Sequence, residues 1–280
     1  MGNLFEVPSV GYGILALLVS SVGTKQLQAV APDFCPAVAI PQADQVTVNI
    51  FDTLTDAVVQ RYHWKAGKTK IYRDPRLDCK GNGNFFITDY TYVQLKSKRS
   101  NPYCLPIPYT NGVVTVVGAT TKQMTEIAPL VHAGTTFLLG CAKGEWDGIR
   151  YTAQDVGRYD PAVLQGLAEA TAPTAQLLHL WRKELLKDER FAHRVVSKAK
   201  GSFGTSDSQF VSVRIDPKVL TLAIACQMFL EFLNFLVNMD AASPEVIALH
   251  RQGIQDAFYP QPKAEVRLET PLEPTIFVAI

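Results

Sequence analysis

Short stretches rich in β-branched and aromatic residues dominate the first half of the chain and predict strands. The predicted strands are residues 45–51, 58–64, 70–73, 84–95, 103–109, 113–119 and 135–141. Two of them, 103–109 and 113–119, flank Asn111-Gly112, a dipeptide typical of two-residue hairpin turns. Pro106 and Pro108 cannot donate ladder hydrogen bonds, so the first arm is expected at a sheet edge. The pattern predicts an antiparallel sheet with a hairpin.

Helical signals dominate the second half, and three of them combine a capping side chain with a proline at the first helical position. Asp160-Pro161, Asp216-Pro217 and Ser243-Pro244 each supply a side-chain acceptor and a preset φ angle. The corresponding helices are expected to reach about Ala170, to include the apolar residues 219–237, and to reach about Phe258. A further long helix is expected from the Thr174 cap to Lys200, ending at Gly201.

Strands followed by helices predict the α+β class, with a mainly β N-terminal half and a mainly α C-terminal half. The expected divisions are an apolar N-terminal segment at 1–44, a β-rich region at 45–150, a helical region at 151–258 and an extended C-terminal arm at 259–280. Late strands that returned to the first sheet would make these regions one integrated domain.

Both ends of the chain are apolar, which favours burial over exposure to water. The C-terminal candidates for assembly contacts are Ile276, Phe277, Val278 and Ile280. They either complete the protein's own sheet or add a strand to a neighbouring subunit. The apolar residues 4–22 can likewise be buried in the protein's own fold or against a neighbouring subunit. Two apolar ends together favour assembly, so a homo-oligomer or multi-subunit complex is expected.

Two apolar segments are candidates for insertion into a membrane. Residues 14–22 are too short to span a bilayer, and no Lys or Arg precedes Lys25, so a secretory signal is not expected. Residues 219–237 are long enough, but their polar residues recur on one helical face, which favours a buried central helix over a membrane span. The predicted location is the cytoplasm or a viral or ribonucleoprotein particle, not the secreted fraction.

The amino-acid composition limits the kinds of site that the chain is expected to form. Hydrophobic residues make up 47% of the chain and can fill a core, whereas charged residues make up 19%, less than soluble proteins usually carry. The five cysteines are scattered without a CxxC pair, so neither a disulfide framework nor a zinc site is expected. No catalytic motif is present, and no metal or cofactor is predicted.

Charge placement is the strongest functional signal. The whole chain carries a formal net charge of +1, yet residues 61–100 hold a surplus of seven positive charges and residues 182–200 a surplus of four. Two basic segments in a nearly neutral chain indicate a polyanionic partner.

The candidate nucleic-acid contacts fall in these two segments. On the expected long helix five cations recur at spacings of three and four, which would align them over about 22 Å. They are Lys183, Lys187, Arg190, Arg194 and Lys198. The first segment adds phosphate contacts at Lys65, Lys68, Lys70, Lys96, Lys98 and Arg99, with stacking candidates Tyr62, Trp64, Tyr90 and Tyr92.

These patterns favour a non-enzymatic, nucleic-acid-associated subunit of a self-assembling complex, of the coat, nucleocapsid or ribonucleoprotein type. It would bind a phosphate backbone, in single strands, without strong sequence readout. Three alternatives stay open. They are a shell protein without nucleic acid, a membrane-active protein, and a hydrolase or transferase using Glu145, Asp147 or the pair Asp74 and Asp78.

Overall fold

The computed structural model describes residues 4–40, 46, 50, 53–54, 70–73, 84–87, 90–94, 104–108, 112–117, 135–140, 148–202 and 215–258. The helices are α1 (Pro8–Ser20), α2 (Thr24–Val30), α5 (Ala153–Val156), α6 (Pro161–Leu185), α7 (Phe191–Gly201), α8 (Pro217–Asn238) and α9 (Pro244–Phe258). The strands are β1 (Ala37–Ile40), β2 (Lys70–Arg73), β3 (Asn84–Ile87), β4 (Tyr90–Gln94), β5 (Cys104–Pro108), β6 (Gly112–Val117), β7 (Thr135–Gly140) and β8 (Ile149–Arg150).

The largest described sheet is parallel and has the strand order β6-β7-β1-β8. In its register Val38 of β1 lies opposite Leu138 of β7 and Ile149 of β8. All four residues of β1 are buried. The β6 sequence carries valines on both faces of the strand, as is typical of parallel strands that are covered on both sides.

The prediction of an antiparallel sheet with a hairpin in an α+β fold is wrong. The two strands expected to form the hairpin have other partners, because β5 pairs antiparallel with β4 and β6 pairs parallel with β7. The strand expected over residues 84–95 is two strands, of which β3 pairs with β2. An Asn-Gly turn signal is local, whereas strand pairing is decided by the context of the whole sheet, so the signal did not fix the partners of these strands.

The strand expected at residues 45–51 is also wrong where the structure describes it. Val46 and Ile50 are helical, as are Thr53 and Leu54. Val46, Ile50 and Leu54 are four residues apart, so they lie on one helical face. Ile50 and Leu54 are both buried in the core.

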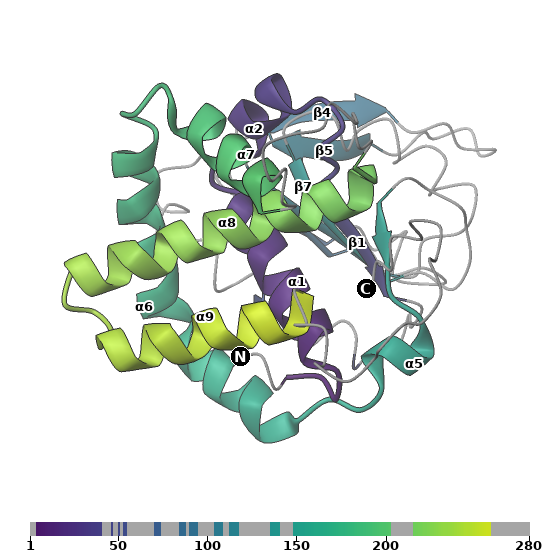
Figure 1. Cartoon of the computed structure of the whole chain (residues 1–280). Coiled ribbons are helices and arrows are strands. Elements are labelled where there is room, and N and C mark those ends of the chain that lie inside the picture. Colours follow the sequence, from purple (N-terminus) through teal and green to yellow (C-terminus); the bar gives the residue numbers. More distant parts are fainter. Residues whose placement is uncertain are drawn as a thin grey trace, which may run out of the picture.

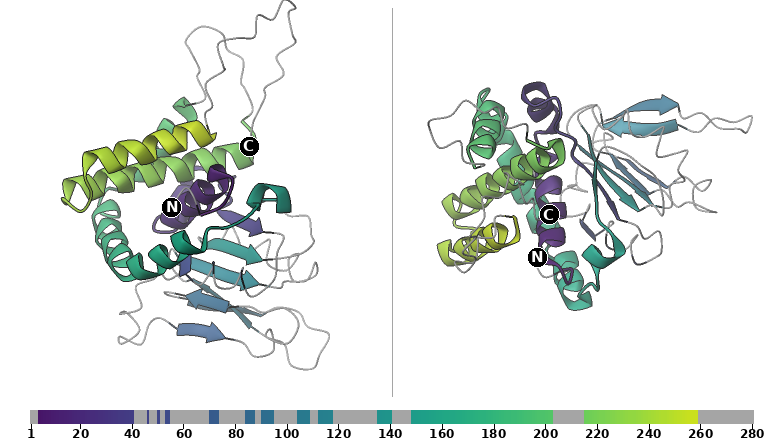
Figure 2. Two further views of the ribbon diagram at one scale, coloured as in Figure 1. Left: turned by 90° about the horizontal axis from the view of Figure 1, so that it is seen from below. Right: turned by 45° about the vertical axis from the view of Figure 1, so that its right-hand side comes forward.

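Helix α1 lies at the centre of the molecule. Figures 1 and 2 show it between the sheet and the pair α8–α9, and it contacts α8, α9 and β7. Every residue from Val10 to Ser20 is buried. The apolar N-terminal segment is therefore covered by the protein's own core, so this segment gives no argument for assembly. Helix α1 also joins residues 4–40 to the helices of residues 151–258 in one hydrophobic core.

Helix α8 contacts α1, α6, α7 and α9. It is long and apolar enough to cross a membrane, and 56% of its most apolar window is buried inside the protein. Helices α1 and α2 meet the same test only as one span bent by 92°. Among the described helices, a membrane span thus has only length and composition in its favour.

The three expected helix starts are confirmed. The Asp160 carboxylate accepts hydrogen bonds from the backbone N–H groups of Ala162 and Val163, at 2.8 and 3.4 Å. The Asp216 carboxylate accepts one from Lys218 at 2.7 Å, and the Ser243 hydroxyl accepts one from Val246 at 3.4 Å. The expected end near Ala170 is wrong, because α6 continues through Pro173 to Leu185.

Candidate nucleic-acid interface

Helix α7 is held in place by one apolar face. Phe191, Ala192, Val195, Val196 and Ala199 are buried, and the helix contacts α8 and α2. The Phe191 ring packs against Gly23, where a Cβ would lie 2.9 Å from the ring edge. The glycine thus lets α7 approach the start of α2 closely, and the exposed residues of α7 lie on its opposite face.

The charged side chains on the exposed face of α7 are all cationic. The charged side chains within this helix are Arg194, Lys198 and Lys200, all of them exposed, with His193 beside them. Arg190 is exposed at the residue preceding the helix. We call Arg190, Arg194, Lys198 and Lys200 the α7 cations.

The unbroken basic stripe expected from residue 183 to residue 198 is not formed. The chain leaves α6 after Leu185 and starts α7 at Phe191. The Asp188 carboxylate accepts a hydrogen bond from the Arg190 backbone N–H at 2.9 Å and so stabilises the connecting turn. Lys183 and Lys187 therefore belong to a different segment from Arg194 and Lys198, and helical spacing does not align the five.

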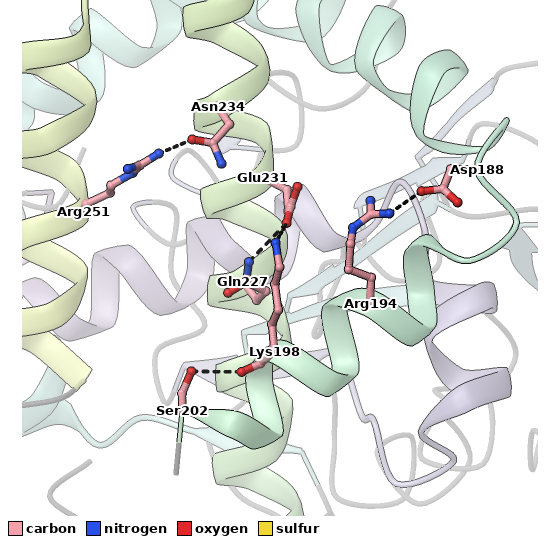
Figure 3. Close-up of polar contacts among 8 residues, drawn as sticks. All are labelled: Asp188, Arg194, Lys198, Ser202, Gln227, Glu231, Asn234 and Arg251. Carbon is pink, nitrogen blue, oxygen red and sulfur yellow. Dashed lines mark hydrogen bonds and ion pairs between the residues drawn. The ribbon is translucent and has the colours of Figure 1, made fainter. Parts of the chain in front are cut away.

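Three of the predicted cations form ion pairs with the chain's own carboxylates. Lys187 Nζ lies 2.7 Å from Glu184 Oε1, and Arg194 pairs with Asp188 across the turn. Lys198 Nζ lies 2.7 Å from Glu231 Oε1 on α8 (Figure 3). The Gln227 amide also donates to this Glu231 oxygen, at 3.3 Å.

The cations of these ion pairs are exposed to water, with side-chain exposures of 70% for Lys187, 42% for Arg194 and 51% for Lys198. The hydrogen bond from Arg194 holds the pKa of Asp188 below its ordinary value. Solvent-exposed pairs contribute little to stability, so another anion can replace Glu184 or Asp188 at small cost. The Glu231 side chain is only 18% exposed, so releasing Lys198 from it costs more.

Among the described residues, two more of the predicted cations, Lys183 and Arg190, form no ion pair, and neither does Lys200, which is not one of the predicted contacts. All three are exposed. They are the cations most directly available to a phosphate.

Most of the first basic segment lies outside the described residues, so its position relative to α7 stays a prediction. Lys70 lies on β2, and Tyr90 and Tyr92 lie on β4, with only their backbones described. The other predicted contacts of that segment lie outside the described residues: Tyr62, Trp64, Lys65, Lys68, Lys96, Lys98 and Arg99. The same holds for the acids Asp74, Asp78, Glu145 and Asp147 and for Ile276, Phe277, Val278 and Ile280.

The described cysteines and acids do not suggest a metal centre. No group of three or more His, Cys, Asp or Glu side chains with metal-binding geometry occurs among the described residues. Cys35 and Cys226 are buried, and burial raises the pKa of the Cys226 thiol to about 12. Cys226 is therefore a protonated core residue at neutral pH.

No sequence motif predicts one feature of the core, a buried hydroxyl group without a described partner. The Tyr151 hydroxyl is buried and has no hydrogen-bond partner among the described residues. Burial raises the pKa of this phenol, so it stays neutral. It lies over Gly13 of α1, where a Cβ would overlap the hydroxyl oxygen.

Tyr151→Phe is expected to leave the free energy of unfolding unchanged or to raise it by up to about 1 kcal/mol, because no hydrogen bond is lost. Urea denaturation measures the change. Tyr12→Phe is the matched control. Its hydroxyl lies 3.3 Å from His250 Nδ1, so its loss is expected to cost about 0.5–1.5 kcal/mol. A Tyr151→Phe variant that is the less stable of the two contradicts the assignment of an unpartnered hydroxyl.

Comparison with known proteins identifies no relative. No family model matches the chain, and no curated protein or solved structure matches it either.

Proposed function

We propose that this protein binds single-stranded nucleic acid through the α7 cations and contacts the phosphate backbone without reading base sequence. The single observation that supports the proposal is the composition of α7, whose charged side chains are all cationic and exposed while its other face is buried. A helix anchored in this way holds the backbone of its cations in place, so little backbone conformational freedom is lost on binding.

The dimensions of the surface suit a phosphate chain. Ten residues separate Arg190 from Lys200, so the cations extend over about 15 Å. Each strand of duplex DNA carries a phosphate roughly every 3.4 Å along the helix axis, so about four phosphates of a stacked strand fit along this length, and fewer of an extended one. Each phosphate that pairs with a cation releases condensed counterions, which supplies the binding free energy.

The internal carboxylates set the order in which the cations bind. Arg190 and Lys200 are available at once, whereas Arg194 and Lys198 must leave Asp188 and Glu231. A backbone phosphodiester presents two anionic oxygens, as does the carboxylate that it replaces, so the exchange keeps each cation paired. Lys183 is a further exposed cation in the last turn of α6.

Membership of a self-assembling complex remains part of this proposal. It rests on the apolar residues 276–280, since the apolar N-terminal segment is buried in the core.

The charge-reversal variant Arg190→Glu/Lys200→Glu tests the proposal. Both side chains are exposed and form no ion pair in the described part of the chain, so the fold is expected to persist. A small loss of stability is expected because Arg190→Glu places a second carboxylate near Asp188. Fluorescence anisotropy with labelled oligouridylate, between about 50 and 200 mM salt, gives the affinity and its salt dependence. The variant is expected to bind more weakly, and its slope of log K against log salt to fall by about 1.4, which is roughly 0.7 for each lost contact.

The control is Arg158→Glu/Arg251→Glu, which changes the net charge equally on other elements. Arg158 precedes α6 and Arg251 donates to Asn234 from α9, where the Asn234 amide can donate to the new carboxylate (Figure 3). The control is expected to keep the wild-type slope. A wild-type protein that does not bind the oligonucleotide, or equal slopes in the two variants, contradicts the proposal.

A further inference from the structure

An apolar cavity of about 200 Å³ lies among helices α1, α6, α8 and α9. Its walls include Leu15 and Leu18 of α1, Leu177 of α6, and Phe229 and Leu233 of α8. The polar residues on the walls are Thr53, Thr174 and His250. We call this space the inner cavity.

The walls of the inner cavity are fixed by close packing. Phe232 of α8 lines the cavity and packs against Trp181 of α6, with ring centroids 5.2 Å apart and a tilt of 45°. Leu18 and Leu233 are buried on the cavity's other sides. A leucine- and phenylalanine-lined cavity of roughly 150 Å³ stays dry and binds a benzene-sized molecule, so this larger one can accept a ring or a short alkyl chain.

His250 is the titratable residue at the boundary of the inner cavity. It also lines a second, more polar cavity of about 690 Å³, together with Ser9, Tyr12, Gln252 and Asp256. This is the outer cavity. A molecule with its apolar part in the inner cavity therefore has its polar end beside His250.

The orientation of His250 is set by Tyr12. The Tyr12 hydroxyl lies 3.3 Å from His250 Nδ1, and the two rings form an edge-on pair with centroids 6.2 Å apart. Gly253 provides the space, since a Cβ there would overlap the Tyr12 hydroxyl. Among the described residues, His250 Nε2 has no hydrogen-bond partner.

The protonation of His250 selects the polar group of the ligand. Burial lowers the pKa of His250, so the ring is neutral at neutral pH. Its free nitrogen is then a donor or an acceptor, according to which role Nδ1 takes toward Tyr12. A hydroxyl group satisfies both tautomers, whereas a charged group would lose hydration without meeting an opposite charge on the inner walls.

We propose that the inner cavity binds a small apolar alcohol or phenol, with the hydroxyl group hydrogen-bonded to His250 Nε2 and the ring or alkyl chain against α1 and α8. Few convergent polar groups on an apolar wall are the usual composition of a small-molecule site. The half-exposed Val246 of α9 lies at the opening of this site.

Benzyl alcohol and toluene, which differ by one hydroxyl group, are the probes. Isothermal titration is expected to show binding of both by the wild-type protein, with benzyl alcohol about three- to tenfold tighter, as one neutral hydrogen bond provides. His250→Phe is expected to abolish the difference between the two probes. Equal affinities for the probes in the wild-type protein overturn the role of His250.

Val246→Trp places an indole at the opening and is expected to abolish binding of both probes. Leu180→Trp is the matched control, because Leu180 is a similarly exposed apolar residue of α6 that does not line the cavity. Should Val246→Trp fail to fold by circular dichroism, methyl NMR of the wild-type protein locates the probe, with shifts expected at Leu15, Leu18 and Leu233. Absence of binding, or shifts confined to other methyl groups, overturns the proposal.

Discussion

Leu17→Ala is expected to lower the free energy of unfolding by about 3–5 kcal/mol, the upper part of the range for a buried leucine. Leu17 is fully buried in the middle of α1 and does not line either cavity. Because α1 is packed on all sides, the side chains around Leu17 are held in place and cannot collapse into the space that the leucine leaves. The loss therefore combines transfer of apolar surface with the cost of a new cavity.

Urea denaturation followed by circular dichroism measures this loss. Leu249→Ala on α9 is the control, because the Leu249 side chain is 70% exposed and its removal is expected to change stability by less than about 0.5 kcal/mol. Equal stabilities of the two variants would contradict the central position of α1.

Gly13→Ala is expected to destabilise the protein by about 1–3 kcal/mol, the usual cost of overpacking. A Cβ at Gly13 would overlap the Tyr151 hydroxyl and lie 3.5 Å from side-chain atoms of Leu222 and Phe258. Tyr151 cannot move away easily, since it is buried and its backbone N–H donates to Ala39 beside the sheet. The alanine therefore pushes α1 away from the sheet.

Two further variants show whether this overlap is the cause. Gly166→Ala in α6 is expected to stabilise the protein by about 0.5–1 kcal/mol, because nothing lies within 4 Å of the added Cβ and alanine favours the helix. Tyr151→Phe removes the overlapping oxygen and is expected to restore part of the stability lost in Gly13→Ala. Additive effects of Gly13→Ala and Tyr151→Phe would contradict the contact.

Helix starts were predictable because their signals are local. Asp160, Asp216 and Ser243 each cap a backbone N–H two or three residues further along, so the whole interaction lies within one turn. Helix continuity was less predictable. Pro173 and Thr174 resemble a helix start, yet α6 runs through them, and the expected long helix breaks at residues 186–190 instead.

Strand partners were not predictable from the same local reasoning. The alternation and turn signals around Asn111-Gly112 located β5 and β6 closely, but these strands belong to different sheets. The partner of β6 is β7, more than twenty residues later in the chain. Pairing across such a distance depends on which surfaces the rest of the fold buries, and a short window does not contain that information.

The candidate interface also has some features that the local sequence predicts and others that it does not. The surplus of cations at residues 182–200 is a property of composition, and the exposure of the α7 cations follows from the apolar periodicity of Phe191, Val195 and Ala199. The ion pair of Lys198 with Glu231 joins residues 33 positions apart, so no spacing rule could assign it. The pairing of Tyr12 with His250, which positions the second proposed site, spans 238 positions.

Local signals in the chain set the starts of α6, α8 and α9, the apolar segments and the concentration of positive charge, because each depends on residues within a few positions of one another. The tertiary structure alone decided that α1 is the central helix, that the main sheet is parallel, and which cations keep a carboxylate partner. These depend on contacts between distant segments, whose stabilisation comes from total buried surface and from charges that meet only when the chain is folded.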